Sequence, residues 1–290
     1  MGLLGKWLAA IGGLCIAGVV VLLVVGGSSD SAPAAGAGAG HPSPEARPGP
    51  GGDPSSPART DEPPSTDVPH PPSELGTVRA RAQVLSLDAP EDGYPVVWVR
   101  KKRAVEVRTE PGGGERIYLA RKRTGFGSPT VFGVLRQEGK WAAVSTPEVA
   151  NGDVGWVKLD PRRLRSGWVR TSIVVDLSLR RAELRKGERV LRSFSVTVGA
   201  PGSDTPTGRY AVTDTFRGDL GPAYGCCAVA ISANQPNLPS GWLGGNRIAF
   251  HGTAGPLGVA ASHGCVRAAD ADVSYLVDRA FLGTPVFVRG

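Results

Sequence analysis

Residues 28–74 set the first limit on what this chain can fold into, because they contain almost no large apolar side chain. They consist mainly of Ser, Ala, Gly, Pro and Asp, and they hold many of the chain's 25 prolines. Such a segment buries too little surface to offset the entropy lost on ordering it. We therefore expect a disordered linker over 28–74, flexible at first and stiffer through the proline-dense residues 42–72.

The first 27 residues have a different character. Lys6 precedes an apolar run over residues 7–25, which is near the roughly 20 residues that a membrane helix requires. This length favours an uncleaved membrane anchor over 1–27, with Lys6 on the inner side. A cleaved signal peptide is the alternative, with residues 32–34 as its small-residue site. In both cases the remainder of the chain is expected outside the membrane.

Residues 75–168 contain short β-branched or aromatic runs separated by turn residues, which is typical of a small all-β domain. The expected strands are residues 96–99, 104–108, 131–135, 141–145 and 155–157. The Arg-Thr-Glu-Pro turn at 108–111, Trp141 and the Gly-Trp-Val at 155–157 resemble bacterial SH3-like wall-associated modules. The alternative is a β extension that only packs on the next domain.

Residues 169–290 carry stronger strand patterns, expected over residues 173–177, 181–185, 190–198, 210–213, 247–250 and 285–288. The residues at 230–245 are expected to form a loop that leads to His251. After Arg267 the apolar spacing becomes helical, with Asp270 and Asp272 near the expected N-terminus and Gly283 at the stop. The sequence thus predicts a mostly β protein whose last domain has one clear helix.

The formal net charge is +7, and Lys and Arg gather in clusters such as residues 100–103 and 162–165. A basic surface suits an anionic partner, either a membrane, a nucleic acid or an acidic wall polymer. Simple solvation of exposed turns is the alternative. Nucleic acid is disfavoured, because no stacking aromatics are interleaved with the basic runs and the domain is expected to be exported.

Two of the four histidines and one of the four cysteines lie together in residues 251–267. A cysteine attacks carbonyl carbon as a thiolate, which needs a base or an electrostatic field that lowers its pKa. His251 at a strand end and His263 near Cys265 offer that base. Gly264 permits a tight turn with N–H groups directed at developing negative charge, and Arg267 is able to hold a carboxylate. This pattern predicts thiol chemistry at Cys265.

Two other uses of these side chains compete. His251, His263 and Cys265 are three plausible zinc ligands, but the absence of a Cys-x-x-Cys pair and the Gly-rich surroundings favour a nucleophile. We therefore expect no metal and no cofactor. The adjacent Cys226 and Cys227 are free to pair with each other, to pair with another chain, or to stay reduced. A disulfide from either of them to Cys265 would remove the nucleophile.

Three separated blocks carry a family resemblance. His-Gly-Thr at 251–253, Ser-His-Gly-Cys-Val-Arg at 262–267 and Thr-Pro-Thr-Gly-Arg-Tyr at 205–210 resemble the L,D-transpeptidase family of the YkuD type. The resemblance covers residues 171–289 and implies a YkuD-like β-sandwich with one helix. It implies that Cys265 is the nucleophile, that His251 is its general base and that the backbone carbonyl of Gly252 orients His251. It assigns the oxyanion and substrate-positioning roles to Ser262, His263, Gly264 and Arg267.

The resemblance also implies a reaction on peptidoglycan stem peptides. Cys265 would form a thioester with the third, diamino-acid residue of a tetrapeptide donor, and a side-chain amine of another stem would resolve it as a 3→3 cross-link. Carbapenem-type β-lactams are the expected inhibitors. The alternatives are an L,D-carboxypeptidase, an enzyme that attaches or releases a wall-linked protein, and a non-catalytic wall-binding protein. The expected place is the cell envelope, with membrane contact through the N-terminal segment.

Overall fold

The computed structural model describes residues 84–218, 220–242 and 245–290, which all belong to one compact unit. The anchor expected over 1–27, the linker over 28–74 and the first residues of the region expected over 75–168 lie outside the described residues. Within the described part of the chain, no helix is both long and apolar enough to cross a membrane.

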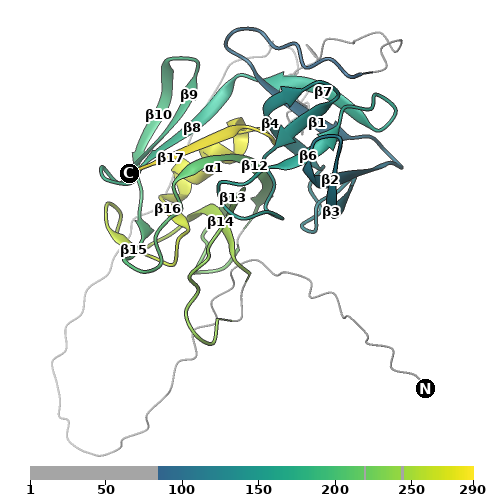
Figure 1. Cartoon of the computed structure of the whole chain (residues 1–290). Helices are drawn as coiled ribbons and strands as arrows, with labels where there is room; N and C mark the ends of the chain where they lie inside the picture. Colours follow the sequence, from purple (N-terminus) through teal and green to yellow (C-terminus); the bar gives the residue numbers. More distant parts are fainter. Residues whose placement is uncertain (1–83, 219, 243–244) are drawn as a thin grey trace, which may run out of the picture. The chain divides into compact units, whose positions relative to one another are not determined.

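The first seven strands form one antiparallel sheet in the order β3-β2-β6-β5-β4-β1-β7 (Figure 1). Its strands are β1 (Tyr94–Val99), β2 (Ala104–Glu110), β3 (Gly113–Arg121), β4 (Val131–Glu138), β5 (Trp141–Val144), β6 (Gly155–Lys158) and β7 (Leu164–Val169). The alternating Val and Leu side chains predicted as strands pack on one another, with Val97, Val107 and Val157 fully buried. That this sheet is an SH3-like module stays a prediction.

The later strands form an eight-stranded sheet in the order β10-β9-β8-β17-β12-β13-β14-β16. They are β8 (Thr171–Asp176), β9 (Arg181–Lys186), β10 (Arg189–Ser195), β12 (Gly208–Arg217), β13 (Cys227–Asn234), β14 (Arg247–Gly252), β16 (Val266–Ala268) and β17 (Pro285–Arg289). Two pairs, β17 with β8 and β14 with β16, are parallel. A separate parallel pair joins β11 (Val198–Gly199) to β15 (Ala260–Ser262).

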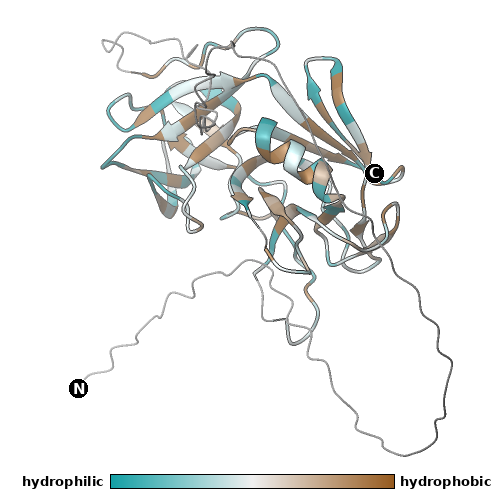
Figure 2. Cartoon of the chain, turned by 180° about the vertical axis from the view of Figure 1, so that it is seen from behind, coloured by the Kyte–Doolittle hydropathy of each residue, from teal (hydrophilic) through white to brown (hydrophobic). Residues whose placement is uncertain are grey.

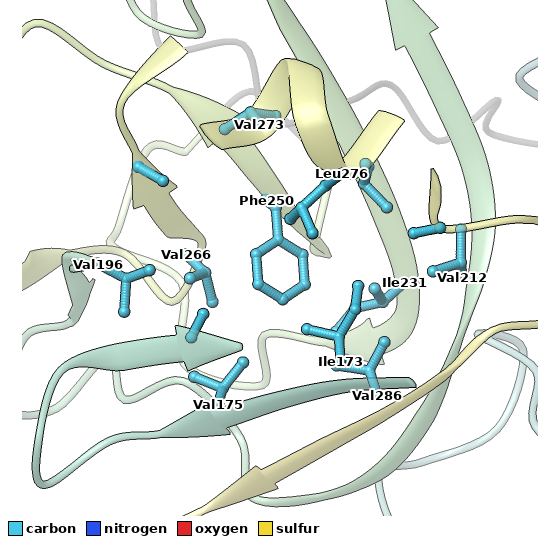
Figure 3. Packing of buried hydrophobic residues seen from close by; sticks show 14 of the residues in the cluster. Ile173, Val175, Val196, Val212, Ile231, Phe250, Val266, Val273, Leu276 and Val286 are labelled. Atoms are coloured by element: carbon cyan, nitrogen blue, oxygen red, sulfur yellow. The ribbon is translucent and has the colours of Figure 1, made fainter. Parts of the chain in front are cut away.

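The only helix among the described residues is α1 (Asp270–Arg279), which packs on β12, β13 and β14. It buries Val273, Leu276 and Val277, as its apolar spacing predicts. Figure 3 shows Leu276 close to Phe250, at the centre of the cluster between helix and sheet. Gly283 follows the helix with φ +86°, which glycine adopts without strain. The mostly β fold with one helix is thus confirmed.

Side chains alternate between the core and the outside along the strands, as the sequence pattern predicts. In β9 the apolar Ala182 and Leu184 are buried and the charged residues between them are not. Figure 2 shows this as alternating brown and teal bands along the edge strands. One face of the second sheet therefore packs against the core. Because successive side chains of a strand point to opposite faces, polar side chains of the central strands are expected on the other face.

Two sequence expectations were wrong. Residues 230–234, expected in a loop, belong to β13, whose residues are nearly all buried. Its small Ala and Ser side chains have a weak preference for strands, so the sequence pattern does not indicate one. Hydrogen bonding and packing between β12 and β14 stabilise it as a strand. The single strand expected over 190–198 is interrupted. Val196 and Val198 stay buried, but the chain leaves β9 after Ser195 to pair with β15.

Candidate active site

The predicted base lies in the middle of the second sheet. His251 belongs to β14, where it is paired with Ala228 of β13 on one side and with Arg267 of β16 on the other. Its side chain is only 3% exposed. Because the preceding Phe250 points into the core, His251 points to the opposite face of the sheet. The backbone hydrogen bonds to β13 and β16 therefore fix the position of the His251 backbone, from which the imidazole extends.

The imidazole of His251 is held in one tautomer. Its Nδ1 lies 2.9 Å from the backbone oxygen of Gly252. A carbonyl oxygen only accepts hydrogen bonds, so Nδ1 carries the proton in this contact and the neutral ring keeps its lone pair on Nε2. The Tyr224 ring lies against the imidazole at a centroid distance of 4.8 Å. This geometry leaves Nε2 as the nitrogen able to accept a proton.

Among the described cysteines, Cys265 lies outside the Cys226–Cys227 disulfide, and it is 9% exposed. It directly precedes β16 and lies two residues before Arg267, the partner of His251. The alternation along β16 puts Cys265 on the same side of the sheet as His251, since Val266 points into the core with Phe250. Its Sγ lies 3.9 Å from the backbone oxygen of Arg247 in β14. The fold thus places the thiol just before β16 and the imidazole on the neighbouring strand β14.

A short turn over residues 262–265 delivers Cys265. The Ser262 hydroxyl accepts the Gly264 N–H at 3.1 Å and donates to the Cys265 carbonyl at 2.6 Å, so one side chain closes the turn. Gly264 has φ +104°, and a Cβ there would overlap Nε2 of Gln235. The oxyanion role expected of the Gly264 N–H therefore competes with its hydrogen bond to Ser262. The buried Ser262 serves the turn rather than the substrate in this arrangement.

Two further side chains hold the same turn, and sequence reasoning gave neither of them a role. The Thr205 hydroxyl donates to the Gly264 carbonyl at 2.8 Å and accepts the Gly199 N–H at 2.9 Å. The buried Gln235 places Nε2 3.2 Å from the His263 carbonyl, with two more carbonyls of residues 203–204 at 3.1 Å. Thr205 had a signal, as part of the Thr-Pro-Thr-Gly block. Gln235 had none.

The other predicted residues are more peripheral. His263 is exposed, and its ring lies 5.2 Å from the Trp242 ring, centroid to centroid. Arg267 exchanges backbone hydrogen bonds of 2.8 Å with Thr197, and its Nε is buried without a hydrogen-bond partner. Among residues 84–218, 220–242 and 245–290, no three His, Cys, Asp or Glu side chains come close enough together to hold a metal ion.

A buried ion pair lies along β14 from the base. Arg247 Nη1 lies 3.8 Å from Oδ2 of Asp214 and donates to the Thr213 hydroxyl at 3.0 Å. Burial lowers the pKa of the Arg247 guanidinium, and the Asp214 carboxylate opposes that shift. Asp214 is fully buried, so removing either partner would leave an uncompensated charge. The pair anchors the strand whose carbonyl contacts Cys265.

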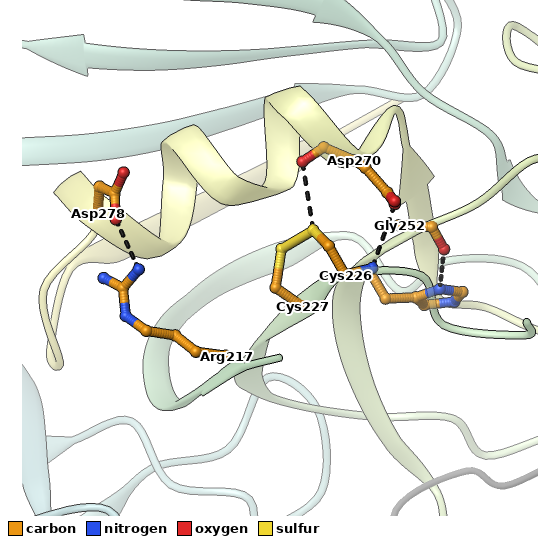
Figure 4. The surroundings of a disulfide bond; sticks show 7 residues. Arg217, Cys226, Cys227, Gly252, Asp270 and Asp278 are labelled. Carbon is orange, nitrogen blue, oxygen red and sulfur yellow. Dashed lines mark hydrogen bonds and ion pairs between the residues drawn. A yellow bond between two sulfur atoms is a disulfide. The ribbon is translucent and has the colours of Figure 1, made fainter. Parts of the chain in front are cut away.

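Cys226 and Cys227 form a disulfide with each other. Of the pairings left open by the sequence, the structure contains the vicinal one, and Cys265 keeps its thiol. The disulfide lies at the start of β13, beside the N-terminus of α1 (Figure 4).

Comparison with known proteins gives the C-terminal region a family. Residues 170–288 match the family model of YkuD, the L,D-transpeptidase catalytic domain. A search of curated proteins found no match. Solved structures that resemble this chain include the avibactam carbamoyl enzyme of Ldtfm, with 21% identity, 42% of this chain and 49% of that chain covered, and a TM-score of 0.33.

Two more solved structures are similar. An L,D-transpeptidase from Xylanimonas cellulosilytica has 23% identity and a TM-score of 0.32, covering 42% of this chain and 61% of that one. LdtMt1 in complex with imipenem has 16% identity and a TM-score of 0.36, covering 51% of this chain and 90% of that one. The chain spans 49% of the length of Ldtfm and 61% of that of the Xylanimonas protein.

Proposed function

Because residues 170–288 form a domain of the YkuD family of L,D-transpeptidase catalytic domains, we propose that this protein is a peptidoglycan L,D-transpeptidase with Cys265 as its nucleophile. The observation that carries the proposal is the contact of His251 Nδ1 with the Gly252 carbonyl. It leaves the Nε2 lone pair as the acceptor of a thiol proton, on the side of the sheet where Cys265 lies. A general base beside a buried thiol is the arrangement that activates a cysteine nucleophile.

The first half-reaction follows from this pair. Nε2 of His251 takes the proton of the Cys265 thiol, and the thiolate forms a bond to the carbonyl carbon of the third, diamino-acid residue of a tetrapeptide. The carbonyl becomes an oxyanion, and in this proposal the backbone N–H groups of His263 and Cys265 stabilise it, since the Gly264 N–H donates to Ser262. When the oxyanion collapses, the bond to the terminal D-alanine breaks and the proton on Nε2 passes to its amine. A thioester on Cys265 remains.

The second half-reaction reverses these roles. The side-chain amine of another stem peptide attacks the thioester carbonyl and gives its proton to Nε2 of His251. Collapse then breaks the carbon–sulfur bond, the Cys265 thiolate takes the proton from Nε2, and a 3→3 cross-link remains. The chemistry uses the Cys–His pair alone, and the buried setting of both groups shelters the thioester from bulk water.

The setting of the domain supports a wall substrate. The net charge of +7 suits an anionic wall polymer. We propose that the apolar residues 7–25 anchor the chain in the membrane and that residues 28–74 space the folded part from it. The protein then acts in the cell envelope, outside the membrane. We further propose that carbapenem-type β-lactams acylate Cys265 and so inhibit the protein.

Incubation of the full chain with disaccharide-tetrapeptides, followed by analysis of the muropeptides, tests the proposed function. A cross-linked dimer with release of D-alanine is the expected product. Tripeptide without dimer would show water as the acceptor and replace transpeptidation by carboxypeptidation. An unchanged substrate would contradict the enzyme assignment.

Acylation by imipenem tests the nucleophile, with intact mass as the readout. The wild-type chain should gain one drug mass, whereas Cys265→Ala should gain none while its circular dichroism stays unchanged. Cys265→Ser is the matched variant that keeps the shape of the side chain, and it too should fail to acylate within the time that the wild type needs. An adduct on Cys265→Ala would overturn the assignment.

A further inference from the structure

The Cys–His chemistry does not use the contact between the start of β13 and the start of α1. There the N–H of Cys226 donates to Oδ1 of Asp270 at 3.3 Å (Figure 4). The Cys226 Sγ, which is bonded to Cys227 and has no proton, lies 3.4 Å from the backbone oxygen of Asp270. The first residue of the helix is thus tied to the disulfide-bonded turn.

The same carboxylate packs on the residue that orients the base. A Cβ placed on Gly252 would overlap Oδ1 of Asp270, lie 3.0 Å from its Cγ and lie 3.1 Å from the Cα of Gly225. A Cβ on Gly225 would likewise overlap Oδ1 and come within 2.8 Å of the Cα of Gly252. Only glycine leaves room for Oδ1 between these two backbones. Asp270 as a whole is exposed, but its Oδ1 lies in a slot between the backbones of Gly225 and Gly252.

Two contacts connect the residues of this slot to the imidazole of His251. The Gly252 carbonyl accepts the Nδ1–H of His251, and Tyr224, beside Gly225, lies against the imidazole ring. Both groups are within one residue of a glycine that contacts Asp270. Displacement of the carboxylate would free both backbones to move.

On the basis of the proposed function, we propose that Asp270 is a positioning residue for the base His251. Its Oδ1 accepts the Cys226 N–H and wedges Gly225 against Gly252. This fixes the direction of the Gly252 carbonyl and hence the tautomer and orientation of the imidazole. The Cys226–Cys227 disulfide holds the Cys226 N–H next to Oδ1 of Asp270.

Asp270 also occupies the first turn of α1, where a negative charge stabilises the helix dipole. The two roles demand different properties of the side chain. The dipole needs charge, which glutamate supplies and asparagine lacks. The slot needs a short side chain with an acceptor oxygen, which asparagine supplies and glutamate, longer by one methylene, does not.

The experiment compares Asp270→Asn, Asp270→Glu and Asp270→Ala in the full chain, kept in detergent, by the rate constant of imipenem acylation. A misplaced base should cost about ten- to a hundredfold in Glu and Ala, whereas Asn should stay within about threefold of the wild type. Asp278→Ala is the matched control, because Asp278 lies on the same helix in an exposed ion pair with Arg217 at 2.7 Å. It should acylate like the wild type.

A second readout does not depend on activity. ¹H–¹⁵N spectra of histidine-labelled chain report which ring nitrogen of His251 carries the proton. The wild type and Asp270→Asn should show the Nδ1–H form, and Asp270→Glu a mixture with the Nε2–H form. Thermal unfolding of each variant identifies any loss of fold. If Asp270→Ala does not fold, the comparison of Asp270→Asn with Asp270→Glu still tests the proposal.

Opposite results overturn the inference. Wild-type acylation by Asp270→Glu with a slow Asp270→Asn would assign Asp270 to the helix dipole. Wild-type rates and an unchanged His251 tautomer in all variants would leave it no role at the site. If the wild type itself is not acylated, the proposed function fails, and the tautomer spectra still decide the role of Asp270.

Discussion

The two halves of the proposed reactive pair, His251 and Cys265, are held by different kinds of interaction. His251 lies inside β14, with a backbone ladder on each side. Cys265 lies at the end of a turn that depends on the side chains of Ser262, Thr205 and Gln235. Backbone ladders tolerate many substitutions, whereas a turn fixed by three side chains weakens when one of them is lost. The strand that carries the base is therefore robust, and the turn that carries the nucleophile is vulnerable.

The largest expected effect separates the two histidines. Loss of a general base typically costs about 10²- to 10⁴-fold, and we expect a fall of that size in the acylation rate constant of His251→Ala. His263→Ala should lie within about threefold of the wild type, because its ring is exposed and its carbonyl, which Gln235 contacts, is retained. Time-resolved intact mass with imipenem measures both. Equal losses would mean that the wrong histidine is assigned as the base.

Gly264→Ala should break the turn itself. Its φ of +104° disfavours a side chain, and the new Cβ would overlap Gln235 and approach Cδ1 of Ile248 at 2.9 Å. Displacement of Cys265 should slow acylation by about a hundredfold. Gly258→Ala is the matched control, since Gly258 has φ +77° but open space around its Cβ position. If both variants acylate equally slowly, backbone strain rather than the clash with Gln235 is responsible.

Gln235→Glu tests whether a side chain that touches neither reactive group matters. The carboxylate would face the carbonyls of residues 203, 204 and 263 without a proton to donate. Loss of such buried hydrogen bonds costs roughly 1–3 kcal/mol, so acylation should fall by about tenfold through disorder of the turn. Gln137→Glu, on the exposed end of β4, should leave the rate unchanged. Acylation of Gln235→Glu at the wild-type rate would show that the turn is held without it.

Thr205→Val should have the smallest effect. Valine keeps the shape of threonine but removes the hydroxyl that joins Gly199 to Gly264. Of the two hydrogen bonds lost, the one to the Gly264 carbonyl holds the turn, and one net hydrogen bond is worth about 1 kcal/mol, which corresponds to roughly a fivefold slower acylation. Thr205→Ser, which retains the hydroxyl, should restore most of the rate. A fully active Thr205→Val would move the support of the turn entirely to Ser262 and Gln235.

Several elements were predictable because their signals are local. The strand at 181–186 alternates, and the helix at 270–279 repeats its apolar residues at helical spacing. The helix ends at Arg279 with Ala280 as its C-cap, before the stop expected at Gly283. Residue type and spacing predicted thiol chemistry at Cys265, and the family resemblance of the surrounding blocks implied His251 as the base. β13 escaped prediction because its small residues become a strand only between two neighbours.

The sequence by itself determined a mostly β fold with one helix, and it predicted which residues carry the chemistry. The tertiary structure alone decided how the reactive groups are held. The contacts of Gln235 with the turn, of Asp270 with Gly252 and of Cys226 with Cys227 depend on the exact approach of side chains to backbone. Gln235 and His263 are 28 positions apart in the sequence. A single hydrogen bond between such distant residues produces no repeating sequence pattern, so the sequence gives no sign of it.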